Sequence, residues 1–595
     1  MHTLISQRIA ALRRHMSLIG INATIIPHAD PHQSEYMSPH WHVRHFFSGF
    51  SGSAGTLVVT DKEALLWTDS RYFLQATQQL AGTEIKLMKE GIAETPTINQ
   101  FLSATLKCGS KIGFDGILFS QSTTDELIAT FSPLGISIVD DFAPINDIWH
   151  DRPDLPDDKA YIHSLEYAGE SSQDKIATTL ATLTECGASA IFISALDEIA
   201  WLLNIRGSDV KYNPVVTSFL FLSNSKSTLF IDKKKVTDEV KIYLDSLNIN
   251  TAPYDSVAEY LSHLSTDIKV LVNPAITSSY FGRIIGKRAI WASSPISLPK
   301  ALRNDTQINA IRSVMQRDGA ALVKAFKEIE KRISQNITTT EIDIATILRH
   351  HRSYDPLFKD ESFSTIAGYA EHGAIVHYEA DEESNSTIEA KGLLLIDSGA
   401  QYLDGTTDIT RTIALGTPTE QERYDFTLVL KGHIALASAV FPLGTRGAQL
   451  DVLARHFLWE KGLTYLHGTG HGVGHFLNVH EGPHSIRLQE NPIVLQAGMV
   501  TSNEPGLYRA GVHGIRCENL ILTVPAFTTE FGEFLKFETI TQFPFDTALM
   551  QIDLMTDQEI AWVNEYHAGV YASLSQLLDD DCRRWLESKT APITR

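Results

Sequence analysis

The residues best suited to chemistry lie in a glycine-rich stretch between positions 467 and 475, which contains three histidines among four glycines. His480 follows a few residues later. Histidine is the commonest protein ligand for metal ions at neutral pH, and glycine allows close backbone approach and unusual backbone angles. A lone histidine is usually structural, whereas three within this short stretch favour a binding or metal site. The chain has no HExxH motif, which argues against a zinc site carried on one helix.

Two aspartates lie near the ends of neighbouring predicted strands. The apolar run 393–396 predicts a buried strand that ends at Asp397, and Asp404-Gly405 predicts a hairpin turn before Asp408 and the strand 409–415. Such a hairpin would bring Asp397 and Asp408 together beside an apolar core, where both would resist ionisation unless a cation is bound. The alternatives are that Asp397 caps a turn and that Asp408 begins a solvated strand, and the pair alone leaves this open.

Two glutamates complete the candidate set. Glu504 follows the apolar residues 499–500, and Glu518 precedes the strand-like run 520–524. Each of them alone could be a surface glutamate beside a turn. Together with the aspartates and one imidazole they form an oxygen-rich ligand set that suits Mn²⁺, Co²⁺, Fe²⁺ or Zn²⁺. Two such ions about 3.5–4 Å apart can share carboxylates and activate a bridging hydroxide, which is hydrolase chemistry.

The elements before these residues form two similar stretches. In the first, the Gly52-Ser53 turn precedes the strand-like runs 57–59 and 65–67, and in the second Gly207-Ser208 precedes 219–222 and 229–231. The pattern predicts a duplicated α/β domain, with the alternative that Gly-Ser turns before strands are simply common. Prolines and acidic residues in 152–158 predict a linker, and 294–299 marks a second boundary.

Helices are predicted near both ends of the chain and after the second boundary. Ile5, Ile9, Leu12 and Met16 have the spacing of an amphipathic surface helix. A long helix follows residue 299, and Gly319 on its apolar face either weakens it or marks a close packing contact. Residues 360–550 are rich in strands and glycine turns, and 556–559 have the form of a capping box.

Composition and charge restrict the class of protein. The formal net charge of −21 argues against a nucleic-acid or anionic-membrane partner. Four scattered cysteines suit a reducing compartment. Arginines interrupt the first apolar stretch, unlike in a signal peptide, and no segment has the ~18 uninterrupted apolar residues of a membrane helix. We therefore expect a cytoplasmic protein.

The ordered ligand set resembles the five-ligand signature of the pita-bread metallopeptidases, in the order Asp397, Asp408, His471, Glu504, Glu518. The match is closest to the three-domain cytosolic Xaa-Pro aminopeptidases (aminopeptidase P) and spans nearly the whole chain. The matching motifs are at 48–55, 67–73, 196–202, 206–210, 397–400, 404–411 and 503–506. The resemblance implies an α/β (α+β) fold with creatinase-like domains at 1–155 and 156–298. A pita-bread catalytic domain with a C-terminal extension would occupy 299–595.

The resemblance also implies roles for the ligands. Asp397 would bind one ion, Asp408 and Glu518 would bridge both ions, and His471 and Glu504 would hold the other. Glu504 would in addition shuttle the proton of the bridging water.

Further roles follow from the same resemblance. His377 matches a histidine that binds substrate near the scissile bond, His480 one that contacts the peptide carbonyl, and His467 a residue of the proline pocket. Arg516 and Tyr508 would orient the ligand carboxylates. The chain departs from the family pattern at His475, Leu507 and Cys517, which concerns fine specificity and metal preference.

The implied activity is hydrolysis of the N-terminal Xaa–Pro bond of peptides by a metal-bridged hydroxide. Mn²⁺ is the first expectation for the two ions, with Co²⁺ and Zn²⁺ as alternatives, and a homodimer is expected. The alternative functions are a prolidase, which cleaves Xaa-Pro dipeptides, and a non-catalytic pita-bread module that binds proteins. Two preceding domains argue against a methionine aminopeptidase, and five retained ligands argue against a metal-free creatinase.

Overall fold

The computed structural model describes residues 2–595, which divide into two compact units. The first unit comprises the chain up to His163 together with Glu170–Ile296, and the second comprises Ser164–Gly169 and Ser297–Arg595. No helix among the described residues is long and apolar enough to span a membrane. The predicted domain boundaries at 155/156 and 298/299 stay predictions.

The first unit contains two six-stranded mixed sheets with the same strand order and orientation. One has the order β4-β3-β2-β1-β5-β6 and the other β12-β11-β10-β8-β13-β14. In each sheet the third strand runs antiparallel to both neighbours and all other pairs are parallel. The duplication predicted from the Gly-Ser turns is therefore confirmed. The strands are β1 (Ala23–Ile26), β2 (Thr56–Thr60), β3 (Ala64–Thr68), β4 (Ile85–Lys89), β5 (Lys111–Gly113), β6 (Ser137–Val139), β8 (Ala190–Ile193), β10 (Ser218–Ser223), β11 (Ser227–Ile231), β12 (Ile249–Ala252), β13 (Val270–Val272) and β14 (Ala289–Trp291).

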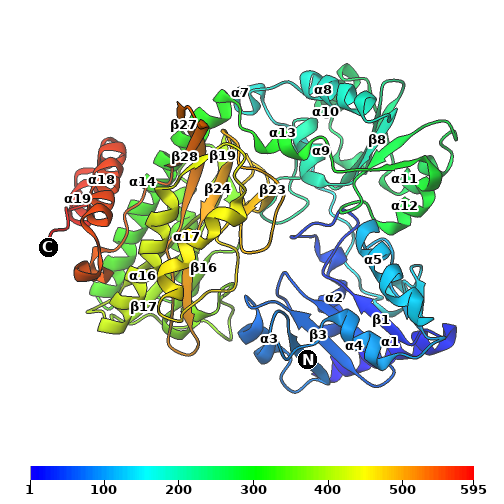
Figure 1. Ribbon diagram of the computed structural model, residues 1–595, viewed down its shortest axis with the longest axis horizontal. Coiled ribbons are helices and arrows are strands. Elements are labelled where there is room, and N and C mark those ends of the chain that lie inside the picture. Colours follow the sequence, from blue (N-terminus) through cyan, green and yellow to red (C-terminus); the bar gives the residue numbers. More distant parts are fainter. Residues whose placement is uncertain (1) are drawn as a thin grey trace. The chain divides into compact units, whose positions relative to one another are not determined.

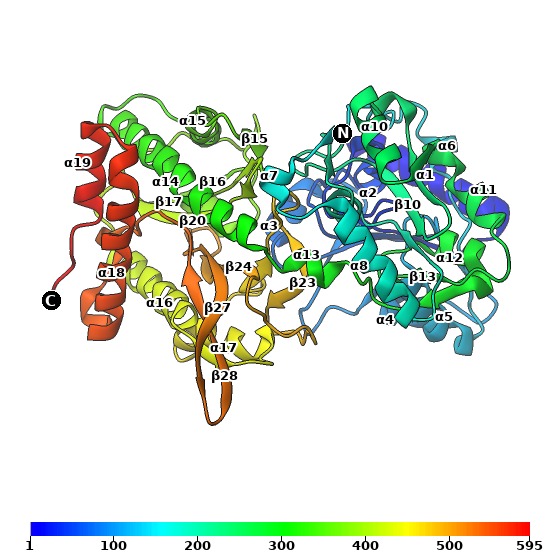
Figure 2. The ribbon, with the colours of Figure 1, turned by 90° about the horizontal axis from the view of Figure 1, so that it is seen from above.

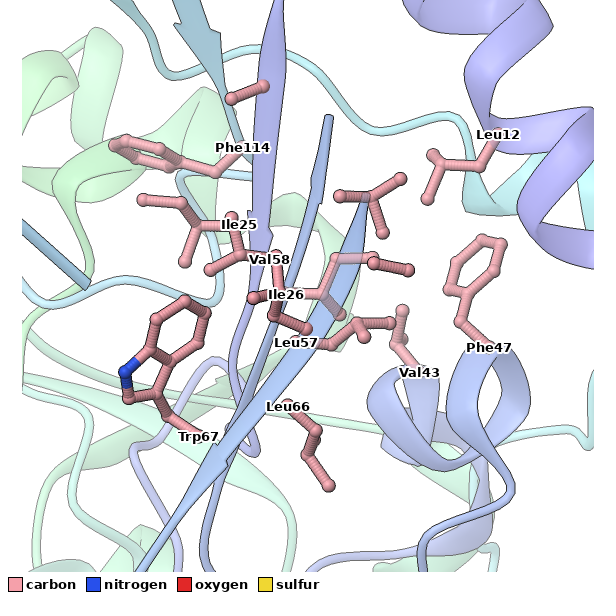
Figure 3. Close-up of a cluster of buried hydrophobic side chains, with 14 of the residues drawn as sticks. Leu12, Ile25, Ile26, Val43, Phe47, Leu57, Val58, Leu66, Trp67 and Phe114 are labelled. Carbon is pink, nitrogen blue, oxygen red and sulfur yellow. The ribbon is translucent and has the colours of Figure 1, made fainter. Parts of the chain in front are cut away.

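The core of the first sheet shows why its sequence folds this way. The predicted amphipathic helix is α1 (His2–Ile19), and its apolar residues Ile5, Ile9, Leu12 and Met16 are all buried. Figure 3 shows Leu12 and Phe47, both on helices, on the same side of the sheet as Val43. Strand residues such as Ile25, Val58 and Trp67 form the other side of this cluster, as expected of a sheet covered by helices.

Helices and sheets alternate in the second unit. The long helix predicted after residue 299 is α14 (Asp305–Ser334), which packs against α15 (Glu341–Arg352), α18 (Asp557–Leu574) and α19 (Asp580–Lys589). Figures 1 and 2 both show α18 and α19 beside α14. The capping box predicted at Thr556 opens α18.

Gly319 in α14 marks a close packing contact, which was one of the two alternatives. A Cβ atom at this position would lie 2.2 Å from the carbonyl oxygen of Gln542. The helix therefore approaches the chain at residue 542 more closely than any other side chain would allow.

The strands of the second unit form antiparallel sheets. The small sheet β16-β17-β20 consists of Ile366–Tyr369, Leu393–Ser398 and Ile409–Ala414, and it pairs Asp397 with Thr410. The predicted hairpin is present, since β18 (Ala400–Tyr402) pairs with β19 (Gly405–Thr406) next to Asp404. The six-stranded sheet has the order β21-β28-β27-β24-β22-β23, with strands Val440–Pro442, Gly532–Thr539, Asn519–Thr529, Val500–Asn503, Gly470–Gly472 and Glu481–Ile486. A separate hairpin joins β25 (Gly506–Arg509) and β26 (His513–Arg516).

The description of 360–550 as strands and turns was incomplete. It also contains α16 (Glu420–Ala437) and α17 (Gly447–Trp459), which pack on each other. The chain from 425 to 434 in α16 is buried on every side, so its apolar residues do not form a single stripe of helical period.

A short helix from the N-terminal half belongs to the second unit. This helix is α7 (Leu165–Ala168), and the side chain of Asn304 donates a hydrogen bond to the carbonyl of Ala168 at 2.9 Å. Gly169 then leaves the helix with φ +71°, which is the left-handed region that glycine adopts without strain.

Candidate metal centre

Strand ends of the second unit carry the five predicted ligands. Asp397 lies in β17, Asp408 directly precedes β20, and His471 lies in β22. Glu504 directly follows β24, and Glu518 directly precedes β27. Because these strands belong to two different sheets, residues more than a hundred positions apart in the chain are brought to one place.

The ligand atoms of three of these residues form a compact group. One such atom each from Asp408, His471 and Glu518 lies within 4.8 Å of the others. His471 Nε2 is 3.4 Å from Asp408 Oδ2 and 3.4 Å from Glu504 Oε1. His471 Nδ1 lies 3.0 Å from the carbonyl of Gly472, which directs Nε2 as a ligand atom toward the carboxylates.

Burial and mutual repulsion perturb the titration of the carboxylates. Burial, together with the charges of the neighbouring carboxylates, raises the pKa of Glu518 well above its usual value. Burial also raises the pKa of Asp397 and Glu504, although Arg516 opposes the rise. Burial alone would lower the pKa of His471, but Asp408 and Glu504 outweigh it and raise this pKa to about 9.

The donor set fits divalent cations. Asp397 Oδ2 accepts a hydrogen bond from Arg516 at 2.5 Å, while Oδ1 of the same carboxylate is buried and has no hydrogen-bond partner among the described residues. A buried carboxylate oxygen left without a partner is costly. A cation bound by Asp397 and its neighbours would satisfy this oxygen and remove the repulsion between the carboxylates.

A chain of hydrogen bonds connects the ligand Asp397 with His467. Arg516, which donates to Asp397, also donates to the hydroxyl oxygen of Tyr508 at 2.8 Å. That hydroxyl lies 2.8 Å from His467 Nε2, and His467 Nδ1 lies 2.7 Å from the carbonyl of Gly468. Burial raises the pKa of Tyr508 to about 12, so the phenol remains protonated and can donate to His467. Arg516 thus contacts the predicted ligand Asp397 directly, whereas Tyr508 contacts it only through Arg516.

The other two predicted substrate residues lie on loops of the same unit. The ring of His480 meets that of His471 edge to face, with centroids 4.3 Å apart. His377 is half-buried in the irregular segment after η6 (Ala370–Ala374), and η6 packs against β17, β25 and β26.

Thr410 is a further residue of the centre, outside the set predicted from the sequence. Its hydroxyl donates to Glu518 Oε2 at 2.6 Å and accepts from Arg516 Nε at 3.0 Å. It therefore orients one ligand and the arginine that holds another. A signal was present, because residues two apart on a strand face the same side, which places Thr410 on the side of Asp408.

Relatives of this chain match it over nearly its whole length. Aminopeptidase P2 from Arabidopsis thaliana is 40% identical over 632 residues, which cover 99% of this chain and 89% of the relative. A probable Xaa-Pro aminopeptidase P from Aspergillus niger is 40% identical, with 99% of both chains covered. The family model described as metallopeptidase family M24 matches residues 309–525. The chain belongs to metallopeptidase family M24.

Other parts of the chain match further models that accompany M24 domains. The creatinase/prolidase N-terminal domain matches residues 8–144 and again 151–307, and the C-terminal region of M24 peptidases matches 533–593. The α/β fold with creatinase-like domains and an M24 pita-bread domain, expected from the resemblance, is confirmed.

Solved structures of the M24 family agree with this fold. The X-prolyl aminopeptidase of Caenorhabditis elegans, described as a cytosolic enzyme with a di-nuclear active site, covers 100% of both chains with a TM-score of 0.96 and 36% identity. A prolidase from Pyrococcus horikoshii covers 62% of this chain and 99% of its own at 21% identity, with a TM-score of 0.50, and shows likeness of fold only.

The departures from the M24 pattern have physical explanations in the structure. His475 is buried, and its Nε2 lies 3.1 Å from the carbonyl of Tyr167 in α7. Leu507 and Cys517 are buried in one apolar cluster, and burial raises the pKa of the Cys517 thiol to about 12. Neither Leu507 nor Cys517 therefore adds a charged group beside the ligands.

Proposed function

We propose that this chain is an aminopeptidase that hydrolyses the N-terminal Xaa–Pro bond of peptides with two divalent cations. The observation that carries the proposal is the convergence of Asp408, His471 and Glu518 within 4.8 Å, with Glu504 in contact with His471. Similarity over the full length to proteins named Xaa-Pro aminopeptidase P and to a di-nuclear X-prolyl aminopeptidase supports the substrate class and the number of cations.

The ligand roles extend this proposal. Asp397 would hold one cation, Asp408 and Glu518 would bridge both, and His471 and Glu504 would hold the other. When bound, such cations act as Lewis acids and lower the pKa of a coordinated water. Mn²⁺ is our proposed ion, and Co²⁺ and Zn²⁺ are the alternatives that the same ligand set would accept.

Glu504 is the proposed general base and general acid. Burial raises the pKa of this carboxyl above its usual value, which favours its role as a proton carrier. It takes a proton from the attacking water and passes it to the proline nitrogen as the amide bond breaks. That nitrogen is a tertiary amide without N–H, so its protonation is needed for departure and no residue can recognise it as a donor.

The three histidines are proposed to bind substrate. His480, beside His471, would donate to the carbonyl oxygen that becomes negative during attack, which is a form of electrostatic preorganisation. His377 would bind the peptide near the scissile bond. His467, oriented by the hydroxyl of Tyr508, would line the pocket for the proline ring.

Assembly and location are proposed on grounds of similarity. We propose a homodimer, and a cytoplasmic location is supported by the similarity to the X-prolyl aminopeptidase of Caenorhabditis elegans, which is described as cytosolic.

Peptide hydrolysis after chelation tests the function. We expect release of arginine from Arg-Pro-Pro, but not from Arg-Ala-Pro or the dipeptide Arg-Pro, after Mn²⁺ is added back to the chelated chain. Cleavage of Arg-Pro alone would instead indicate a prolidase. Inactivity on all three peptides with Mn²⁺, Co²⁺ and Zn²⁺ would favour a non-catalytic binding module.

A further inference from the structure

The carboxylate of Glu341 is a buried acceptor for four different groups. Glu341 is the first residue of α15 and is 0% exposed. One oxygen accepts from the backbone N–H of Tyr369 at 2.9 Å and from His372 Nδ1 at 2.9 Å. The other accepts from the hydroxyl of Tyr378 at 2.7 Å and from the backbone N–H of Ser386 at 2.8 Å.

These donors all belong to the stretch that carries His377. Between β16 and β17 the chain contains η6 and then no further helix or strand up to residue 392. Tyr369 ends β16, and His372, Tyr378 and Ser386 follow in this stretch, so one carboxylate fixes it at its start, at its middle and near its end. Tyr378 is the direct neighbour of His377 in the sequence.

The same stretch is also fixed by a backbone contact. A Cβ atom at Gly514 in β26 would lie 1.6 Å from the carbonyl oxygen of Gly373 in η6. β26 also carries Arg516, which donates to the proposed ligand Asp397. The segment therefore contacts both Glu341 and the strand that carries Arg516.

We propose that Glu341 is a positioning residue, which places His377 for substrate binding through Tyr378 and the rest of this segment. The inference rests on the proposed function, because it takes His377 to contact the peptide. A carboxylate suits the role better than an amide, because all four partners donate hydrogen bonds and both oxygens must accept.

A double-mutant cycle distinguishes positioning from general support of the fold. Glu341→Gln keeps the size of the side chain but replaces one accepting oxygen with a donor. We expect kcat/KM for Arg-Pro-Pro with Mn²⁺ to fall by about 10- to 100-fold, as for a misplaced binding group. In the His377→Ala background, Glu341→Gln should cause no further fall in kcat/KM, because Glu341 acts through the contact between His377 and the peptide, which is already lost.

Tyr378→Phe provides a milder variant if Glu341→Gln fails to fold. It removes one of the four donors without changing the size of the ring, and we expect a smaller fall that also disappears in the His377→Ala background. Tyr402→Phe is the matched control, because its hydroxyl likewise donates to a buried carboxylate, Asp318, at 2.8 Å. This control should retain the wild-type kcat/KM.

Amide hydrogen exchange of residues 369–388 gives a measurement that does not depend on activity. Exchange should accelerate there in Glu341→Gln and in Tyr378→Phe, and not in Tyr402→Phe. Equal losses of kcat/KM with and without His377, or wild-type exchange in both variants, would overturn the positioning role. A wild-type chain inactive on every Xaa-Pro peptide would overturn the proposed function, and the positioning role with it.

Discussion

Arg516 and His471 compensate only part of the charge at the centre. Four carboxylates converge there, Asp397 accepts a hydrogen bond from Arg516, and His471 lies 3.4 Å from both Asp408 and Glu504. The raised pKa values of Asp397, Glu504 and Glu518 are the consequence of burial and of this crowding. Bound cations are therefore expected to contribute to stability as well as to chemistry.

The pH dependence of stability follows from these shifts. A raised carboxyl pKa contributes stability that is present below about 4.5 and lost as pH rises through the folded value. For His471, the stability is present below 6.5 and lost as pH rises through about 9. We therefore expect the Tm of the chelated chain to fall from pH 6.5 to 9, while the Mn²⁺-loaded chain changes less.

Calorimetry of the chelated and the Mn²⁺-loaded chain across this pH range measures the difference between their Tm values, and this difference should widen as pH rises. Glu518→Gln is the control, because it removes one of the repelling charges and should flatten the fall in the chelated chain. A Tm difference between the two forms that narrows as pH rises would contradict the explanation from the raised pKa values.

Replacement of Glu504 tests the proton transfer. Glu504→Gln should lower kcat on Arg-Pro-Pro by about 10²- to 10⁴-fold, because an amide cannot carry the proton. The exposed Glu490, which pairs with Arg446 on the surface, provides the control Glu490→Gln with wild-type kcat. Metal content is measured in parallel, since Glu504 is also a proposed ligand. Full activity in Glu504→Gln would refute the role.

Local motifs are what the sequence could offer for single residues. The hairpin around Asp404 and the histidines among glycines are short patterns, and the structure brings Asp408, just after the hairpin, together with His471 and Glu518. Glu341 could not be found in this way, because its four partners lie 28–45 residues away and only the folded chain brings them together.

At the scale of elements, the helix α14 is the clearest case of sequence dictating packing. Gly319→Ala would force a methyl group against the carbonyl of Gln542, only 2.2 Å away. We expect the free energy of unfolding to fall by about 1–3 kcal/mol.

A second helical glycine provides the control. Gly569 in α18 is exposed, and a Cβ atom there would meet nothing within 4 Å. Gly569→Ala should stabilise the chain by roughly 0.5–1 kcal/mol, because alanine loses less backbone entropy than glycine. Equal shifts in Tm for both variants would exclude the packing explanation.

Periodicity predicted elements that keep an apolar stripe over much of their length. α1 was predicted in this way, and so was α14, which keeps such a stripe toward both ends although residues 318–323 are buried without interruption. α16 is buried on most sides, and its period is hidden for that reason.

For the whole molecule, α7 is a short piece of the N-terminal half of the chain that belongs to the second unit. Its acceptors are the carbonyls of Tyr167 and Ala168, which contact His475 and Asn304. Gly169→Ala would bring a Cβ atom within 2.5 Å of Asn304 Oδ1 and should weaken this contact.

Gly187→Ala is a matched control for this change. Gly187 has the same φ of +71° but nothing within 4 Å of its Cβ position. Both changes impose the left-handed cost of about 1–2 kcal/mol. Only Gly169→Ala should lose a further 1–3 kcal/mol, roughly, from the steric clash. Calorimetry of both variants checks the difference, and equal losses would show that the contact contributes little.

The membership of α7 in the second unit also bears on how such a gene can be inherited. The catalytic half is not one uninterrupted stretch, since Ser164–Gly169 is separated from Ser297 by the whole of Glu170–Ile296. A recombination event that transferred only the codons from 297 onward would leave behind one hydrogen-bond partner of the buried His475. Lineages that carry His475 are therefore expected to pass on both halves together, and a free-standing catalytic half should have a different residue at this position.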